Sequence, residues 1–166
     1  MKKIIILFIA ITLFSCNDGD FDVPSFEFSE TVSVCGEYVL YISNSSKKEV
    51  LALNLTTTQL GTTVEEKSFS ISKTASTSSI KATYRILDAA IVSNYFCQTI
   101  PPLTPKVTKE LIAESGTVII KTTEVISNNV VTGYKFEISM TDLLFFDGTE
   151  RVYFETFKFG ILTVNI

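Results

Sequence analysis

The sequence has no histidine and no tryptophan, and it has few prolines, glycines and cysteines. Without histidine, Ser-His-Asp and Cys-His catalysis and histidine-based zinc sites are excluded. Without tryptophan, the usual aromatic platform for stacking a sugar ring is missing. Gly133 and Gly160 stand alone, so the chain has no glycine-rich loop of the kind that holds phosphates. These absences remove most simple hydrolases and phosphate-binding motifs from consideration.

The composition favours one β-rich domain. The chain has 166 residues, and 46% of them are hydrophobic, which is enough to build a core. Threonine, serine, valine, isoleucine and phenylalanine are abundant, as is typical of strands. The formal charge is -4, and loss of the first fifteen residues removes Lys2 and Lys3, leaving 12 basic and 18 acidic residues, or -6. We therefore expect no nucleic-acid partner.

The N-terminus has the pattern of a signal peptide. A basic start, Met1 to Lys3, precedes an apolar run of 11 residues from Ile4 to Phe14. Signal peptides have apolar runs of about 7–15 residues, whereas a membrane-spanning helix needs about 20. The sequence therefore predicts a cleaved leader over residues 1–15.

The end of this run carries a family resemblance. Leu13-Phe14-Ser15-Cys16 resembles the lipobox of bacterial lipoproteins. The resemblance implies that the Cys16 thiol receives a diacylglyceryl group, that the leader is cut just before Cys16, and that the new amine is acylated. Two or more acyl chains anchor a protein lastingly, so the membrane is an expected partner. The alternative is an ordinary secretory signal in which Cys16 is incidental.

A short acidic segment follows Cys16. Residues Asn17 to Asp22 resemble the acidic export signal of Bacteroidetes-type surface lipoproteins, which implies an outer-membrane, lipid-anchored protein at the cell surface. The same aspartates alternate as at the start of an EF-hand loop, but Val23 and Ser29 replace the required glycine and glutamate. We expect no metal and no cofactor. We predict a lipidated tether over residues 16–30 and one domain over residues 31–166.

The remaining chain reads as short strands separated by turns. Alternating or continuous apolar patterns predict strands at 32–43, 49–55, 64–72, 80–86, 107–113, 117–126, 134–141 and 152–166, with a further short apolar run at 89–97. Eight or nine such strands predict an all-β, antiparallel β-sandwich of Ig-like or jelly-roll proportions. A barrel is the alternative.

Three local features refine this prediction. Glu114-Ser115-Gly116 lies between two apolar segments and predicts a hairpin, although a helical turn over Lys109 to Glu114 is an alternative. Pro101, Pro102 and Pro105 predict a surface crossover over residues 100–106. The apolar residues that should face inward have even numbers up to Phe154 and odd numbers from Phe157. This change predicts a bulge near Glu155.

The cysteines can be sorted by role. If Cys16 carries lipid, Cys35 and Cys97 remain as a pair in a compartment that permits disulfides. We therefore predict a Cys35–Cys97 disulfide. Two buried free thiols are the alternative.

Two groups of residues are candidates for a site. Phe145 and Phe146, within the apolar run Leu143 to Phe146, form a candidate binding surface for a protein or glycan if the run is a loop, and a buried strand end otherwise. The carboxylates close in sequence, which would be required for glycosidase chemistry, are Glu137, Asp142, Asp147, Glu150 and Glu155. They fall at strand faces and turns where charges are normally solvated.

The sequence as a whole predicts a lipid-anchored protein without enzymatic activity. We expect a surface binding or structural module of the outer membrane, with no catalytic residues. Alternatives are a small carboxylate-dependent glycan hydrolase and a periplasm-facing assembly lipoprotein. The sequence identifies no ligand.

Overall fold

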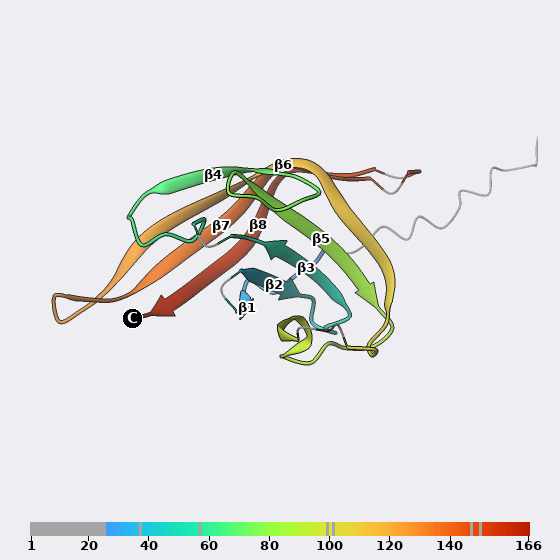
Figure 1. Ribbon diagram of the computed structural model, residues 1–166, viewed down its shortest axis with the longest axis horizontal. Helices are drawn as coiled ribbons and strands as arrows, with labels where there is room; N and C mark the ends of the chain where they lie inside the picture. The colour runs from blue at the N-terminus through green and yellow to red at the C-terminus, as the bar shows by residue number, and fades with distance from the viewer. Residues whose placement is uncertain are drawn as a thin grey trace, which may run out of the picture.

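The computed structural model describes residues 26–166 except residues 37, 57, 99, 101, 147 and 150. The predicted signal peptide and Cys16 lie outside the described residues. The described elements, in chain order, are β1 (Ser33–Cys35), β2 (Val39–Ser43), β3 (Glu49–Asn54), β4 (Glu66–Ile71), β5 (Ser79–Leu87), the 3-10 helix η1 (Tyr95–Cys97), β6 (Val107–Ser127), β7 (Val130–Phe146) and β8 (Arg151–Asn165). This all-β architecture confirms the predicted fold class (Figure 1).

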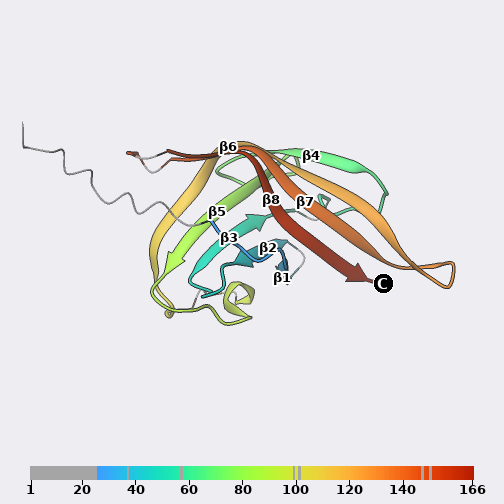
Figure 2. The ribbon, with the colours of Figure 1, turned by 180° about the vertical axis from the view of Figure 1, so that it is seen from behind.

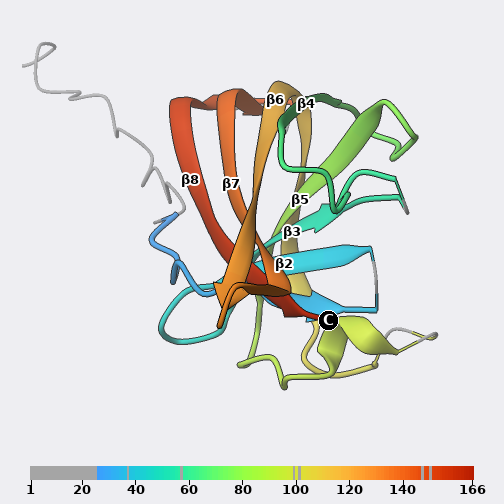
Figure 3. The ribbon, with the colours of Figure 1, turned by 90° about the vertical axis from the view of Figure 1, so that its left-hand side faces the viewer.

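All eight strands belong to one sheet, in the order β1-β2-β3-β5-β4-β6-β7-β8, with an additional β5–β6 pairing. The sheet folds over to form two facing layers. The first half-sheet consists of β1, β2, β3, β5 and the start of β6, and the second consists of β4, the rest of β6, β7 and β8. Figure 3 shows the long strands of the second half-sheet side by side, with β2 and β3 crossing behind them. The two layers of this sandwich are thus connected by β6, which is a strand of both.

The long strand β6 passes from one half-sheet to the other without reversing. Its first part pairs with β5, its later part pairs with β4, and register shifts lie on either side of Ser115. Gly116 has a φ of +140°, a conformation that side chains rarely adopt. The predicted hairpin at residues 114–116 is therefore wrong, as is its helical alternative, because the glycine and the bulges bend a continuous strand.

The main core lies between the two half-sheets. Leu51 and Tyr84 come from the first half-sheet, Ile120 and Met140 come from the second, and each is at most 1% exposed. In β7 the inward residues alternate with outward Lys135, Glu137 and Ser139, within the strand predicted over residues 134–141. A slip by one residue would bury the charges, so packing fixes the register.

The first half-sheet is buried on its other face as well. The connection over residues 88–106, including η1, covers β2 and β3 and forms a second buried cluster with them. The Tyr41 hydroxyl donates to the carbonyl of Ser93 (2.8 Å), and the buried Tyr95 hydroxyl donates to the carbonyl of Pro105 (3.3 Å). Burial on both faces explains the uninterrupted apolar run from Val50 to Leu53. The crossover predicted over residues 100–106 is confirmed, with Leu103 90% exposed.

The predicted strand over residues 32–43 is split in two. Gly36, with a φ of +60°, lies between β1 and β2, which pair antiparallel to each other. The strand β2 forms a hairpin with β3, because Val39–Ser43 pairs with Val50–Asn54 around a polar turn.

In both β7 and β8, the alternation of inward-facing and outward-facing residues is interrupted at the same place. Glu155 and Thr156 are both exposed, opposite Thr141 and Asp142, and Asp142 has a φ of 52°. The register does not shift there. The register shifts closer to the C-terminal end of β8, where Phe159 is an extra residue without a counterpart in β7. The bulge predicted near Glu155 is therefore misplaced, because both strands bend together at that point.

Two phenylalanines of the predicted tether, Phe26 and Phe28, pack against the core. The ring centroid of Phe26 is 4.5 Å from that of Tyr84, 4.8 Å from that of Phe154 and 5.7 Å from that of Phe145. Phe28 contacts the Tyr84 ring at 6.2 Å. The packed body therefore includes residues before the expected boundary at residue 31.

The first and last strands of the sheet approach each other at one point. Thr31 forms an isolated parallel bridge with Ile161, and the Ile161 amide donates to the carbonyl of Glu30 (3.3 Å). Gly160 permits this approach, because a Cβ at this position would lie 2.4 Å from the Glu30 carbonyl oxygen. An ion pair between Lys158 and Glu30 (2.9 Å) lies beside the bridge.

We predict that Gly160→Ala destabilises the fold more than Gly148→Ala does. Both glycines have a positive φ, but only Gly160 has backbone within 4 Å of an added Cβ. The expected loss in free energy of unfolding is about 2–4 kcal/mol for Gly160→Ala and about 1–2 kcal/mol for Gly148→Ala. Urea denaturation measures both values. Equal losses would contradict the close approach at the bridge.

Candidate functional site

An apolar groove lies where the two ends of the sheet separate beyond the Thr31–Ile161 bridge. We call it the β1–β8 groove. It is open to solvent and has a volume of about 330 Å³. Its lining residues are Val34, Gly36, Tyr38, Thr56, Leu60, Thr62, Tyr134, Phe136, Leu162, Val164 and Ile166. Figure 2 shows the end of β8 passing the side of the first half-sheet that carries β1.

The groove exists because β1 and β8 terminate the sheet order and, among the described residues, meet only at the bridge. Beyond Ile161, β8 continues to pair with β7 on one side, and Ile166 donates its amide to the carbonyl of Thr132 (3.0 Å). Successive residues of a strand direct their backbone groups to opposite sides. Since Ile161 bonds toward Glu30, Thr163 and Asn165 direct their N–H and C=O groups toward the open side.

The groove is lined by alternate residues of β8. Leu162 is 6% exposed, Val164 is 42% exposed and Ile166 is 77% exposed, so the apolar surface opens gradually toward the C-terminus. Most other lining side chains are aromatic, aliphatic or hydroxyl-bearing. The Oγ1 of Thr56 is buried and has no hydrogen-bond partner among the described residues. The surface thus suits an apolar ligand better than a charged one.

A second depression, of about 320 Å³, lies on the outer face of the second half-sheet. It is charged, with Glu66, Lys121, Glu137 and Lys158 around it. A hydrogen bond from Lys135 (2.7 Å) and the positive charge of the same lysine lower the pKa of Glu137 below its usual value. A general acid needs a raised pKa, so this carboxylate is suited to stay ionised.

The other carboxylates considered from the sequence do not join Glu137. Asp142 is five residues further along β7, which is about 16 Å in an extended strand. It accepts a hydrogen bond from the Tyr153 hydroxyl (2.6 Å), and this bond raises the pKa of Tyr153. Glu155 is exposed, and Asp147 and Glu150 lie outside the described residues. The described members of this set form no facing pair in a cleft.

The structure separates the two phenylalanines of the candidate binding surface. The run from Leu143 to Phe146 is part of β7 and not a loop. Phe145 is 0% exposed and packs in the main core, whereas Phe146 is 38% exposed and its ring lies 5.5 Å below the Arg151 guanidinium. Phe145 therefore offers no surface to a partner, and Phe146 is a single exposed ring.

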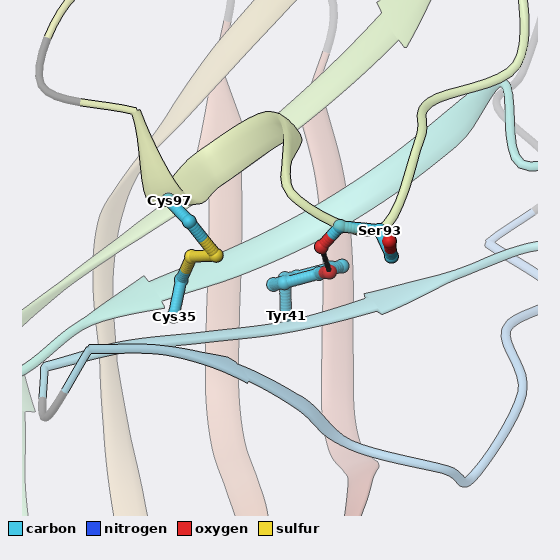
Figure 4. Close-up of a disulfide and its surroundings, with 4 residues drawn as sticks. All are labelled: Cys35, Tyr41, Ser93 and Cys97. Atoms are coloured by element: carbon cyan, nitrogen blue, oxygen red, sulfur yellow. Dashed lines mark hydrogen bonds between the residues drawn. A yellow bond between two sulfur atoms is a disulfide. The ribbon is translucent and has the colours of Figure 1, made fainter.

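The two cysteines of the domain come together. Cys35 at the end of β1 and Cys97 in η1 have their sulfurs at bonding distance, with a Cα–Cα distance of 4.9 Å (Figure 4). This distance lies within the usual range for disulfides. The pair fastens the 88–106 connection to β1, one of the two strands that border the groove.

Comparisons with known proteins give no relative for this chain. No family model, no curated protein sequence and no solved structure matches it. Within the part of the chain that the structure describes, no three histidine, cysteine or acidic residues are grouped to hold a metal ion. The same part contains no helix of the length and apolarity needed to cross a membrane.

Sequence reasoning missed the β1–β8 groove. Its lining comes from several separate segments, and its existence depends on which strands terminate the sheet. The one available signal was the alternation of Leu162, Val164 and Ile166, which continues to the last residue of the chain. That alternation indicates an inward face but not whether the face is covered.

We predict that the disulfide stabilises the domain. Replacing both Cys35 and Cys97 by serine should lower the free energy of unfolding by about 2–4 kcal/mol, because the bond restricts the unfolded chain. Urea denaturation gives the value. In mass spectrometry of unreduced protein treated with a thiol-blocking reagent, neither cysteine should carry the label. Labelling of both would show free thiols instead.

We also predict that Lys135→Met raises the pKa of Glu137 toward its ordinary value. Lys121→Met should raise it less, because Lys121 acts only through a weaker charge interaction. The pKa can be followed by NMR titration of the Glu137 side-chain carboxyl carbon. A larger rise in the Lys121 variant would contradict the assignment of Lys135 as the main cause.

Proposed function

We propose that this protein is a lipid-anchored outer-membrane lipoprotein at the cell surface, and that its β-domain is a non-catalytic binding module. The observation that carries the binding role is the β1–β8 groove, an apolar surface bordered by open strand edges. The anchor is supported by the resemblance of Leu13 to Cys16 to a lipobox. The Cys35–Cys97 pair supports export, because disulfides persist in oxidising compartments.

The position of the groove suits a tethered protein. The described chain starts at Phe26, which packs against Phe154 in β8. Val164 in the groove is ten residues further along the same bent strand, at most about 33 Å away. A tether that enters the domain at Phe26 would therefore leave the groove far from the anchored end.

The charges of the domain agree with a binding role in the groove. The lysines and glutamates of the outer depression neutralise one another on an exposed sheet face, while the groove lining is apolar. The described lining side chains include no charged group that could neutralise a buried charge on a ligand. The proposed ligand surface is therefore apolar.

We predict that Cys16→Ala abolishes incorporation of radiolabelled palmitate and membrane retention, because Cys16 provides the lipidated thiol and the cleavage site. Cys35→Ser is the control and should retain the label. Protease treatment of intact cells should digest the wild-type protein. Survival of the protein in intact cells would contradict the surface location and favour the periplasmic one.

We further predict that an apolar photoreactive probe, benzophenone, labels the groove. Val164→Lys should reduce labelling of the lining peptides at least tenfold, because it places a charge in the groove. Thr163→Lys is the matched control, since Thr163 is the exposed neighbour on the opposite face. Peptide mapping by mass spectrometry locates the label. Equal labelling of the two variants would contradict the groove as a binding site.

A further inference from the structure

We propose that the β1–β8 groove binds an extended peptide, which adds to the sheet as a strand between β1 and β8. This inference rests on the proposed binding function and specifies the class of ligand. The peptide would run antiparallel to both strands, and alternate apolar side chains would enter the groove.

The two strands that border the groove each have an open edge. Beyond the bridge, β1 pairs only with β2 and β8 pairs only with β7 among the described residues. Thr163 and Asn165 direct their backbone N–H and C=O groups away from β7. Exposed edges of this kind pair with extended chains, and main-chain hydrogen bonds then provide affinity. A rounded apolar molecule would leave these groups without protein partners.

The common direction of β1 and β8 fixes the direction of the peptide. The Thr31–Ile161 bridge is parallel, so β1 and β8 leave it in the same direction. A peptide antiparallel to β8 is therefore antiparallel to β1 as well. It would form the more stable type of ladder on both sides. The bridge sets one end of this site, and the β8 edge continues beyond it through Leu162, Thr163 and Val164.

The side chains that border the groove alternate along the strands. Val34 in β1 and the alternate residues Leu162 and Val164 in β8 line the groove, whereas Thr163 is exposed on the other face. A strand inserted between them would continue both faces. The recognised sequence therefore has apolar residues at every second position and polar residues between them.

The test uses a fluorescein-labelled peptide of seven alternating residues, threonine at positions one, three, five and seven and valine between. Its control has proline in place of the central valine, which removes a backbone donor. The full chain in lipid nanodiscs is titrated by fluorescence polarisation, and backbone amide exchange is followed by NMR. We expect saturable binding, at least tenfold weaker binding of the proline peptide, and at least tenfold slower exchange of the Thr163 and Asn165 amides.

The matched protein variant is Asn165→Pro. It removes a donor from the open edge and leaves the β7 ladder intact, because the Asn165 amide faces away from β7. Peptide affinity should fall at least tenfold, while benzophenone labelling of the groove stays as in the wild type. Equal peptide affinity of the variant and the wild type would overturn strand addition.

The remaining outcomes separate this inference from the proposed function. Benzophenone labelling without peptide binding would overturn strand addition and leave the groove as a binding site. Failure of both would overturn both. Protection of the Thr163 and Asn165 amides without peptide would show that the edge is already occupied, by a second copy if protection rises with concentration and by another segment of this chain if it does not. Either result would overturn the inference.

Discussion

The bend of β6 at Gly116 holds the two half-sheets face to face. On one side of this residue β6 is a strand of the first half-sheet, and on the other side it is a strand of the second. The site is crowded, because a Cβ on Gly116 would lie 2.9 Å from the Cδ1 of Ile71 and 3.1 Å from the Cα of Leu143. Only glycine can adopt this φ without placing a Cβ in this crowded space. The bend thus brings the two inner faces together and creates the core.

The same bend determines where the sheet is open. A single sheet that folds over itself has two end strands. Here β1 and β8 approach each other, but among the described residues the bridge between Ile161 and Thr31, just before β1, is their only pairing. Near Phe26 the opposite end of the core is filled by aromatic rings, whereas the end near Val164 remains an open groove. The proposed binding site is therefore a consequence of incomplete closure, and its apolar lining is the continuation of the core.

The sequence predicts those parts of the fold that local patterns determine. The alternation from Tyr134 to Thr141 fixes an inward face, and the pairing of Cys35 with Cys97 follows once Cys16 is assigned to lipid. The bend at Gly116 could not be predicted, because a glycine between two apolar segments is compatible with a reversal and with a bent strand. The partners of β6 decide between them, and these are distant in sequence. The groove escaped prediction for the same reason, since strand order is a property of the whole sheet.

The backbone contacts of β6 with its neighbouring strands distinguish a bent continuous strand from a hairpin. In a bent continuous strand, Ile112 lies opposite Thr83 of β5, and Val118 lies opposite Phe69 of β4 and Met140 of β7. The measurement is the set of nuclear Overhauser effects between backbone protons of these residues. Our account predicts effects from Ile112 to Thr83 and from Val118 to both Phe69 and Met140, and none between Ile112 and Val118. Effects between Ile112 and Val118 would indicate a hairpin at residues 114–116 and would contradict the account.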